Sequence, residues 1–142
     1  MANYEILKLE NQVCFPLYAC SKEIVKRYTP LLDEINLTYT QYITMMVLWE
    51  KEEVNVKELG KHLYLDSGTL TPVLKKLEQK GYVTRKRDTK DERVLNVAVT
   101  EKGMELQEQA LQIPARVSEG IQMTSDELIT LNGLLRKFLK EF

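Results

Sequence analysis

The sequence has little of what metal sites and cofactor sites are built from. It contains two cysteines and one histidine in 142 residues, with no Cys-x-x-Cys pair, so it lacks the usual ligand set for zinc. Its six glycines form neither a dinucleotide-binding fingerprint nor a phosphate-binding loop. We therefore expect no metal ion and no cofactor.

Long apolar segments are also missing. No run approaches the roughly 20 residues that span a bilayer, and the first residues lack the basic start and apolar stretch of a secretory signal. We expect a cytoplasmic protein without membrane contact, in which Cys14 and Cys20 form no static disulfide. A chain of 142 residues with 44% hydrophobic content predicts one domain with a single core.

Residues 66 to 100 predict a short helix followed by a cationic β-hairpin. Apolar residues recur at helical spacing from Leu70 to Leu77 and predict a buried face. Gly81 suits the left-handed residue that ends a helix. A basic segment, a polar turn and the alternating run from Val94 to Val99 then predict two paired strands. A helix and a hairpin in this order indicate a winged helix-turn-helix.

Charge and polarity along this stretch predict contact with double-stranded DNA. Eight basic and four acidic residues lie between positions 71 and 93, although the net charge of the chain is −1, and a basic patch of this kind is typical of DNA-binding surfaces. The small hydroxyl groups at the helix start can reach base edges or phosphates. We expect major-groove contacts from Ser67, Thr69, Thr71 and Pro72, and contacts on or near the DNA backbone from Lys75 and Lys76. On the wing, we expect Arg93 to enter the adjacent minor groove and Arg85 and Arg87 to contact phosphates. Lys80 is expected near the phosphates as well. The alternative is an ordinary solvated hairpin.

The rest of the chain predicts helices. The expected segments are residues 12–34, residues 39–49 after a capping box at Thr38, residues 56–63, and helices that follow Thr100 and Thr124 and are separated by a break at Pro114. In the second helix, four apolar side chains are expected to be deeply buried: Ile43, Met46, Val47 and Trp49. The predicted fold is mainly α with a small β wing.

The helices outside the winged region predict a homodimer. We expect residues 38–100 to form the DNA-binding lobe, and residues 4–36 and 101–142 to form a helical dimerisation region. The last helix carries a narrow apolar stripe that a second copy would cover, and two recognition helices related by a two-fold axis suit an inverted-repeat operator. The alternative is a monomer whose terminal helices pack on its own winged lobe.

Four segments resemble the MarR family of transcriptional regulators, and most closely its organic-hydroperoxide sensors. These are LENQVCFPLY at 9–18, NLTYTQY at 36–42, LYLDSGTLTPVLKKLE at 63–78 and DERVLNVAVTEKG at 91–103. The resemblance implies a dimeric repressor that leaves its promoter when Cys14 is oxidised. It also implies that tyrosines of the partner subunit, matching Tyr28 and Tyr39, hydrogen-bond this cysteine, with Tyr18 close by. No cysteine follows Cys20, so the resemblance implies the one-cysteine route, in which a small cellular thiol caps the oxidised sulfur.

The residues around Cys14 fit a reactive thiol. If Pro16 occupies an early helical position, Cys14 lies near a helix N-terminus, where the helix dipole favours the thiolate. Val13, Phe15 and Leu17 would make the surroundings apolar, which suits an organic hydroperoxide.

Other interpretations remain open. Cys14 could be a buried structural residue, and a MarR-type repressor could instead release DNA on binding a small phenolic ligand. An enzymatic thiol peroxidase would need a second set of catalytic residues, and none is evident, since His62 fits a surface or packing position. We expect no enzyme. We expect Cys20, well round the helix from Cys14, to have a packing role.

Overall fold

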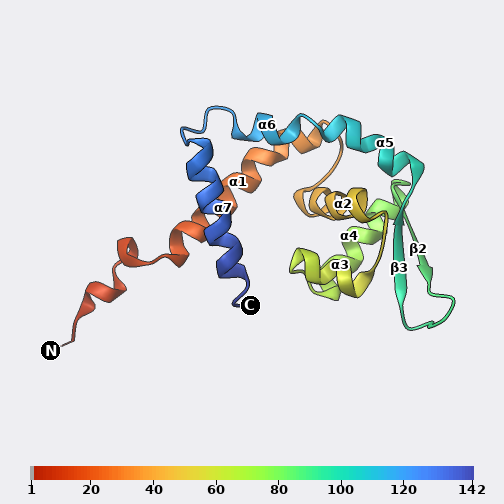
Figure 1. Ribbon diagram of the computed structural model, residues 1–142, viewed down its shortest axis with the longest axis horizontal. Coiled ribbons are helices and arrows are strands. Elements are labelled where there is room, and N and C mark those ends of the chain that lie inside the picture. Colours follow the sequence, from red (N-terminus) through yellow and green to blue (C-terminus); the bar gives the residue numbers. More distant parts are fainter. Residues whose placement is uncertain (1) are drawn as a thin grey trace.

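The computed structural model describes residues 2–142 and is mainly helical (Figure 1). Its elements, in chain order, are two short 3-10 turns η1 (Tyr4–Leu7) and η2 (Leu9–Asn11), then α1 (Cys14–Asp33), α2 (Tyr39–Lys51), β1 (Glu53–Asn55), α3 (Val56–Leu63), α4 (Ser67–Gln79), β2 (Val83–Arg87), β3 (Leu95–Val99), α5 (Glu101–Ala110), α6 (Ile113–Ser118) and α7 (Ser125–Leu139). Among the described residues, no helix is long and apolar enough to cross a membrane.

The elements form two groups. Helices α2, α3 and α4 and the small sheet make one lobe, while α1 and α7 lie beside each other away from it (Figure 1). Helices α5 and α6 follow one another along one side of the molecule and connect the two groups. The break between them falls before Pro114, which occupies the start of α6, where its missing N–H costs no hydrogen bond. The predicted winged helix-turn-helix is confirmed.

Side chains at the helix starts define where the lobe's helices begin. The Thr38 side chain accepts from the Gln41 backbone and the Gln41 side chain accepts from the Thr38 backbone, so the predicted capping box of α2 is confirmed. Asn55 accepts from the Glu58 N–H at 2.8 Å at the start of α3. Asp66 accepts from the Thr69 N–H at 2.7 Å at the start of α4.

Helix α4 ends as its sequence predicts. Gly81 has a φ of +83°, a left-handed conformation that glycine adopts without a Cβ penalty. The Gly81 N–H donates to the Glu78 carbonyl and the Tyr82 N–H donates to the Leu77 carbonyl, each at 3.0 Å. This pair of bonds is a Schellman motif, and it turns the chain directly into β2.

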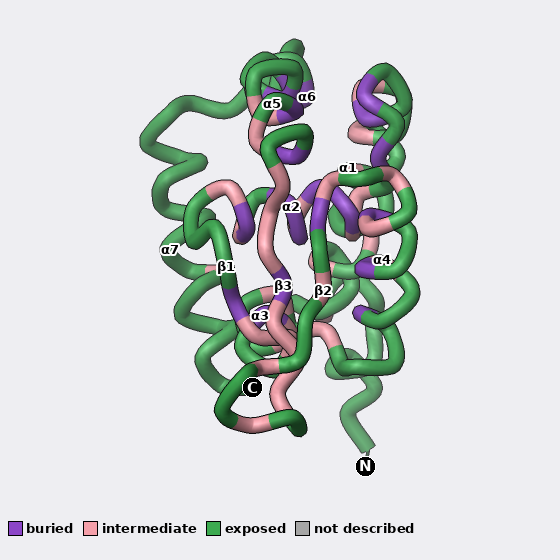
Figure 2. Tube along the Cα trace, turned by 90° about the vertical axis from the view of Figure 1, so that its right-hand side faces the viewer, coloured by how far each residue is buried: buried purple, intermediate pink, exposed green. Residues whose placement is uncertain are grey.

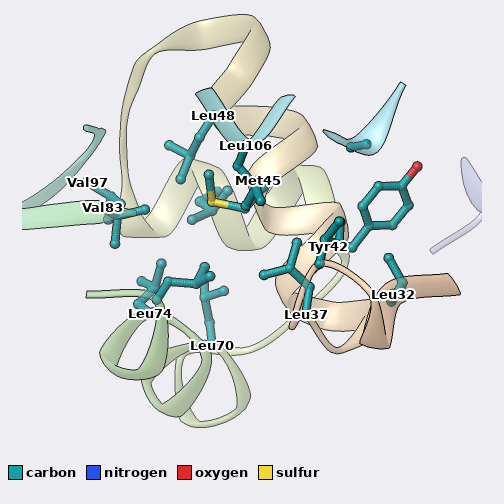
Figure 3. Close-up of a cluster of buried hydrophobic side chains, with 14 of the residues drawn as sticks. Leu32, Leu37, Tyr42, Met45, Leu48, Leu70, Leu74, Val83, Val97 and Leu106 are labelled. Carbon is teal, nitrogen blue, oxygen red and sulfur yellow. The ribbon is translucent and has the colours of Figure 1, made fainter. Parts of the chain in front are cut away.

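The hydrophobic core is centred in the winged lobe and extends to the end of α1 and to α5 and α6. Leu70, Leu74 and Leu77 of α4 are at most 1% exposed and belong to one cluster with Met45 and Leu48 of α2. Figure 3 shows Leu70 and Leu74 on the side of α4 that faces α2. Full burial of such a side chain is worth roughly 1.5–3 kcal/mol. The recognition helix is therefore held by its apolar face while its polar face stays free.

The residues of α2 that we expected to be deeply buried are not the ones that the structure buries. Met46 is 45% exposed, and Ile43, Val47 and Trp49 are only half-buried. The deeply buried face consists instead of Gln41, Tyr42, Thr44, Met45 and Leu48. Two polar residues can lie there because Thr44 donates to the Thr40 carbonyl and Gln41 closes the capping box.

The sheet has one strand more than the sequence predicted. β1 pairs antiparallel with β3, so the strand order is β1-β3-β2. Val54 lies opposite Val97, and both side chains are buried. A three-residue strand with a single buried side chain carries no detectable alternation, and its place in the sheet depends on β3.

The terminal helices leave a large apolar surface uncovered. Figure 2 shows α7 exposed along almost its whole length, and α7 contains no buried residue. Helix α1 buries only Leu32.

Helices α1 and α6 are joined by an ion pair between Glu34 and Arg116, with nitrogen and oxygen 2.5 Å apart.

Candidate functional site

The outer face of α4 presents a row of exposed polar and basic groups. It carries the side chains that the sequence predicted for DNA contact, and all are exposed: Ser67, Thr69, Thr71, Pro72, Lys75 and Lys76. The Thr71 hydroxyl donates to the Ser67 carbonyl at 2.7 Å, so its oxygen remains available as an acceptor. This face has the dimensions and chemistry of a helix that enters a major groove.

The tip of the hairpin is ordered by two aspartates. Asp88 accepts hydrogen bonds from the backbone N–H groups of Lys90 and Asp91 and from the Asn96 side chain. Asp91 binds the Arg93 guanidinium through two contacts of 3.0 and 3.2 Å. The Arg93 side chain is nevertheless 91% exposed, so the aspartate orients it without covering it.

Arg85 lies differently from the other basic residues of the wing. Its guanidinium donates to the Glu78 carboxylate of α4 at 3.0 Å, and its side chain is only 22% exposed. The hydrogen bond from Arg85 lowers the pKa of Glu78. Arg85 lies opposite Val97 in the sheet, on the face that Val83 buries, which explains why it points inward while Arg87, at the end of the strand, is exposed. The phosphate contact expected for Arg85 stays a prediction.

Lys80 is anchored within the protein rather than free for phosphate. Its amine donates to the Asn36 carbonyl at 2.5 Å and to the Gln41 side chain at 3.0 Å. Desolvation, with a smaller contribution from Lys76, lowers the pKa of Lys80. The end of α4 is thereby tied to the segment between α1 and α2.

A groove of about 960 Å³ lies between α3 and the wing. Besides the predicted Arg87 and Arg93, it is lined by Lys57 and Lys61, two exposed residues that sequence reasoning missed. Their spacing of four residues places them on one face of α3, which is the signal that could have identified them. The basic surface therefore continues from the wing onto α3.

Cys14 is the first residue of α1 and is exposed in the single chain. Pro16 occupies an early position of that helix, as expected. The unpaired backbone N–H groups of the first turn and the helix dipole surround the sulfur with partial positive charge. Tyr18 follows one turn later on the same face of the helix and is 62% exposed.

Tyr28 and Tyr39 lie together at the junction of α1 and α2. Their ring centroids are 5.0 Å apart, and the Tyr42 ring lies 5.7 Å from that of Tyr28. Burial raises the pKa of Tyr28 and of Tyr42 further above neutral pH, where even an ordinary phenol is protonated and able to donate. Tyr42 was not predicted at this site, although its position three residues after Tyr39 places it on the same helix face.

Cys14 and Tyr28 of one chain cannot meet. They lie fourteen residues apart on one continuous helix, which separates them by about 21 Å along the axis at 1.5 Å per residue. A contact between this thiol and this phenol can therefore form only between two chains.

Cys20 lines a second, apolar groove between α1 and α7. The groove has a volume of about 570 Å³, and its apolar lining residues are Val13, Pro16, Leu17, Cys20, Leu131, Leu134, Leu135 and Phe138. Cys20 is exposed among residues 2–142, and the packing role expected for it stays a prediction.

Comparison with known proteins reveals clear relatives. The family profile described as "Transcriptional regulator SarA/Rot" matches residues 26–110. The organic hydroperoxide resistance transcriptional regulator of Bacillus subtilis is 47% identical over 137 residues, which cover 96% of this chain and 93% of that protein. The regulator SarZ of Staphylococcus saprophyticus is 48% identical over 133 residues, covering 94% of this chain and 91% of the relative.

Among solved structures, AbfR of Staphylococcus epidermidis is similar over the same length. Its reduced form bound to DNA superposes with a TM-score of 0.84 at 34% identity, covering 96% of each chain. Its disulfide form gives a TM-score of 0.65, covering 96% of this chain and 93% of that one. AbfR has also been solved on DNA in an overoxidised form.

The winged lobe, its exposed recognition helix and the matched relatives define a DNA-binding transcriptional regulator of the winged helix-turn-helix class. Within that class, the chain belongs to the MarR family, in the branch that contains the organic hydroperoxide resistance regulators.

Proposed function

We propose that this protein is a homodimeric repressor that binds an inverted-repeat promoter when reduced and leaves it when an organic hydroperoxide oxidises Cys14. The observation that carries the proposal is the position of Cys14 at the first residue of α1, in a chain 47% identical to an organic hydroperoxide regulator. A regulator of promoters acts in the cytoplasm, and we place the protein there.

The chemistry at Cys14 needs two reactants. The thiolate attacks one oxygen of the hydroperoxide, the O–O bond breaks, and the products are a sulfenic acid at Cys14 and, after protonation, an alcohol. A small cellular thiol then attacks the sulfenic sulfur, which forms a mixed disulfide and releases water. No cysteine follows Cys20, so the thiol must come from outside the chain or from another subunit.

The sensing site would be completed across a dimer. Because Tyr28 lies about 21 Å along α1 from Cys14 of its own chain, we propose that Tyr28 and Tyr39 of one subunit donate to the Cys14 thiolate of the other. Tyr18 would approach the sulfur from within the same chain. A cap on the sulfur would displace these phenols and shift α1 and α2 of the partner.

The DNA interface would combine three elements. We assign base contacts to the first turns of α4, including Ser67, Thr69 and Thr71 with Pro72 beside them, and backbone contacts to Lys75 and Lys76. Arg93 would enter the minor groove while Arg87 binds phosphate. Lys57 and Lys61 would extend the phosphate contacts onto α3.

Replacing Cys14 by serine tests the proposal. The Cys14→Ser variant should bind the DNA upstream of the protein's own gene as tightly as the wild type, and hydroperoxide should no longer release it. Cys20→Ser is the matched control and should respond like the wild type. Mass spectrometry of the oxidised wild type should find the thiol adduct on Cys14. Release of the Cys14→Ser variant by peroxide would refute the assignment.

The dose of oxidant matters in this experiment. AbfR has been solved on DNA in its overoxidised form, so excess peroxide could yield a species that still binds. One equivalent of cumene hydroperoxide with a small thiol limits the reaction to the sulfenic acid and its mixed disulfide. Multiple turnover of hydroperoxide would instead indicate a peroxidase.

A further inference from the structure

Lys80 connects the recognition helix to the segment that leads to Tyr39. The proposed function requires the positions of these two parts to be coupled. It is the C-cap residue of the recognition helix α4. Its amine reaches back to the Asn36 carbonyl, in the segment between α1 and α2, and to the side chain of Gln41, in the first turn of α2. That segment leads directly into Tyr39, the first residue of α2.

A single oxygen atom of Gln41 accepts hydrogen bonds both from the start of α2 and from Lys80. Its Oε1 accepts from the Thr38 backbone N–H at 3.1 Å, which closes the capping box of α2, and from the Lys80 amine at 3.0 Å. Gln41 is 3% exposed, so water does not easily replace either partner. A shift of the first turn of α2 therefore changes the geometry at the Lys80 amine.

The backbone around Lys80 is fixed as firmly as its side chain. The Lys102 amine donates to the Lys80 carbonyl at 2.8 Å, and the Thr100 hydroxyl donates to the Gly81 carbonyl at 2.6 Å. These bonds tie the end of α4 to the start of α5. The C-terminal end of the recognition helix is thus held from two directions, and of these hydrogen bonds those of the Lys80 amine lead towards the tyrosines.

The tyrosine at the other end of the connection belongs to a packed cluster. The Tyr39 ring lies 5.0 Å from that of Tyr28 and 6.3 Å from that of Tyr42, and both Tyr28 and Tyr39 pack against the core. Rings at this spacing cannot move independently. Displacement of the cluster would be passed to the first turn of α2, where Gln41 lies.

We propose that Lys80 is a positioning residue, which holds the recognition helix in register with the segment that carries Tyr39, so that DNA affinity follows the state of the tyrosine cluster. This inference rests on the proposed function, because the cluster is taken to respond to Cys14. Lys80 itself does not touch DNA. It stabilises one orientation of α4, and the reduced state is the one in which its acceptors are aligned.

The test compares Lys80→Met with Lys76→Met, an exposed lysine of the same helix. Affinity for the DNA upstream of the protein's own gene is measured by anisotropy, in the reduced protein and after one equivalent of cumene hydroperoxide with a small thiol, over a range of salt concentrations. Lys80→Met should weaken DNA binding by the reduced protein at least threefold and change the affinity of the oxidised protein little. The ratio of the reduced to the oxidised affinity should therefore fall. The salt dependence should stay that of the wild type.

The control should behave in the opposite way. Lys76→Met should weaken both redox states equally and reduce the slope of log K against log salt by about 0.9, the value for one lost phosphate contact. If Lys80→Met gives that pattern, Lys80 is a phosphate contact and the proposal is overturned. Unchanged binding in Lys80→Met also overturns it.

Substitutions at Gln41 keep the proposal testable if Lys80→Met folds poorly. Gln41→Glu retains an acceptor for both the Thr38 N–H and the Lys80 amine and should keep the wild-type ratio. Gln41→Met removes the acceptor and should lower the ratio as Lys80→Met does, while the double variant should lose less than the sum of the two single losses, because the Lys80–Gln41 hydrogen bond is common to both. Additive losses would contradict a shared contact.

Failure of the proposed function can be distinguished from failure of the proposal for Lys80, because the two give different results. If the wild type itself keeps its DNA after oxidation, the redox mechanism fails. The affinity of reduced Lys80→Met and its salt dependence still decide whether Lys80 positions α4 or binds phosphate.

Discussion

At the residue scale, two arginines of one strand illustrate how position decides function. Arg85 and Arg87 both lie on β2 and have the same side chain, but Arg85 is bonded to Glu78 and Arg87 is exposed. A charge already paired inside the protein is poorly placed to neutralise a phosphate. We therefore expect the two to contribute to DNA binding by different routes.

Salt dependence separates these routes. Arg87→Gln should lower DNA affinity and reduce the slope of log K against log salt by about 0.9. Arg85→Gln should lower affinity with the slope unchanged, because it removes a link between α4 and the wing. Glu78→Gln should act in the same direction as Arg85→Gln. Tighter binding by Glu78→Gln would show that Arg85, once released, binds phosphate as the sequence predicted.

The N-cap of the recognition helix predicts a pH dependence. The hydrogen bond from the Thr69 backbone lowers the pKa of Asp66. A carboxyl group with a lowered pKa in the folded state contributes stability above its unfolded pKa, near 3.9, and loses that contribution as pH falls through the folded value.

Asp66→Asn provides the control for this effect, because asparagine caps a helix equally well without titrating. Urea unfolding of both proteins should show the wild type losing more stability than Asp66→Asn between pH 5 and pH 2. Parallel pH profiles for the two proteins would contradict the cap's role.

At the scale of the element, most of the fold could be predicted because particular residue types mark where its helices begin and end. The capping boxes at Thr38 and Thr124 and the glycine after α4 appear in the structure as the sequence indicated. β1 could not be predicted, because three residues are too few to show the alternation of buried and exposed side chains that is typical of a strand. Its pairing with β3 is also a contact between residues far apart in the sequence. The inward direction of Arg85 could have been inferred from Val83 two residues earlier, since alternate residues share a face.

The start of α3 offers a quantitative test at this scale. Asn55→Ala removes the acceptor of the Glu58 N–H and should lower the free energy of unfolding by about 1 kcal/mol. Asn55→Asp keeps an acceptor and should remain close to the wild type. Equilibrium urea unfolding measures both, and equal stability of Asn55→Ala and the wild type would contradict the cap.

At the scale of the whole molecule, the proposed homodimer would cover the exposed apolar surface of α1 and α7. Leu134 is 60% exposed in the single chain and lines the apolar groove with α1. A glutamate at this position would bring a charge into a subunit interface, which is costly without a partner.

Leu134→Glu should therefore convert the dimer to a monomer in sedimentation analysis and weaken binding to a two-half-site operator. Ile129→Glu introduces the same charge at an exposed apolar residue of α7 that lies about 140° round the helix from Leu134 and outside the apolar groove, so it should remain dimeric. A dimeric Leu134→Glu protein would place the interface elsewhere.

The residues of the proposed sensing site and their assembly across two subunits were both expected from the family resemblance, and both stay predictions. Cys14, Tyr28 and Tyr39 could be named from the sequence, while the separation of the thiol from the phenols follows from the unbroken run of α1. The internal partners of Lys80 and Arg85, which are Asn36 and Gln41 for Lys80 and Glu78 for Arg85, could not be predicted, because the sequence shows where a charge lies along the chain but not which group it contacts.

The central claim is tested most directly by fluorescence anisotropy of the wild-type protein on the DNA upstream of its own gene. We predict tight, salt-sensitive binding by the reduced dimer, loss of binding after one equivalent of cumene hydroperoxide with a small thiol, and recovery with excess dithiothreitol. Binding that persists through oxidation at one equivalent would contradict the account and leave Cys14 without a sensing role.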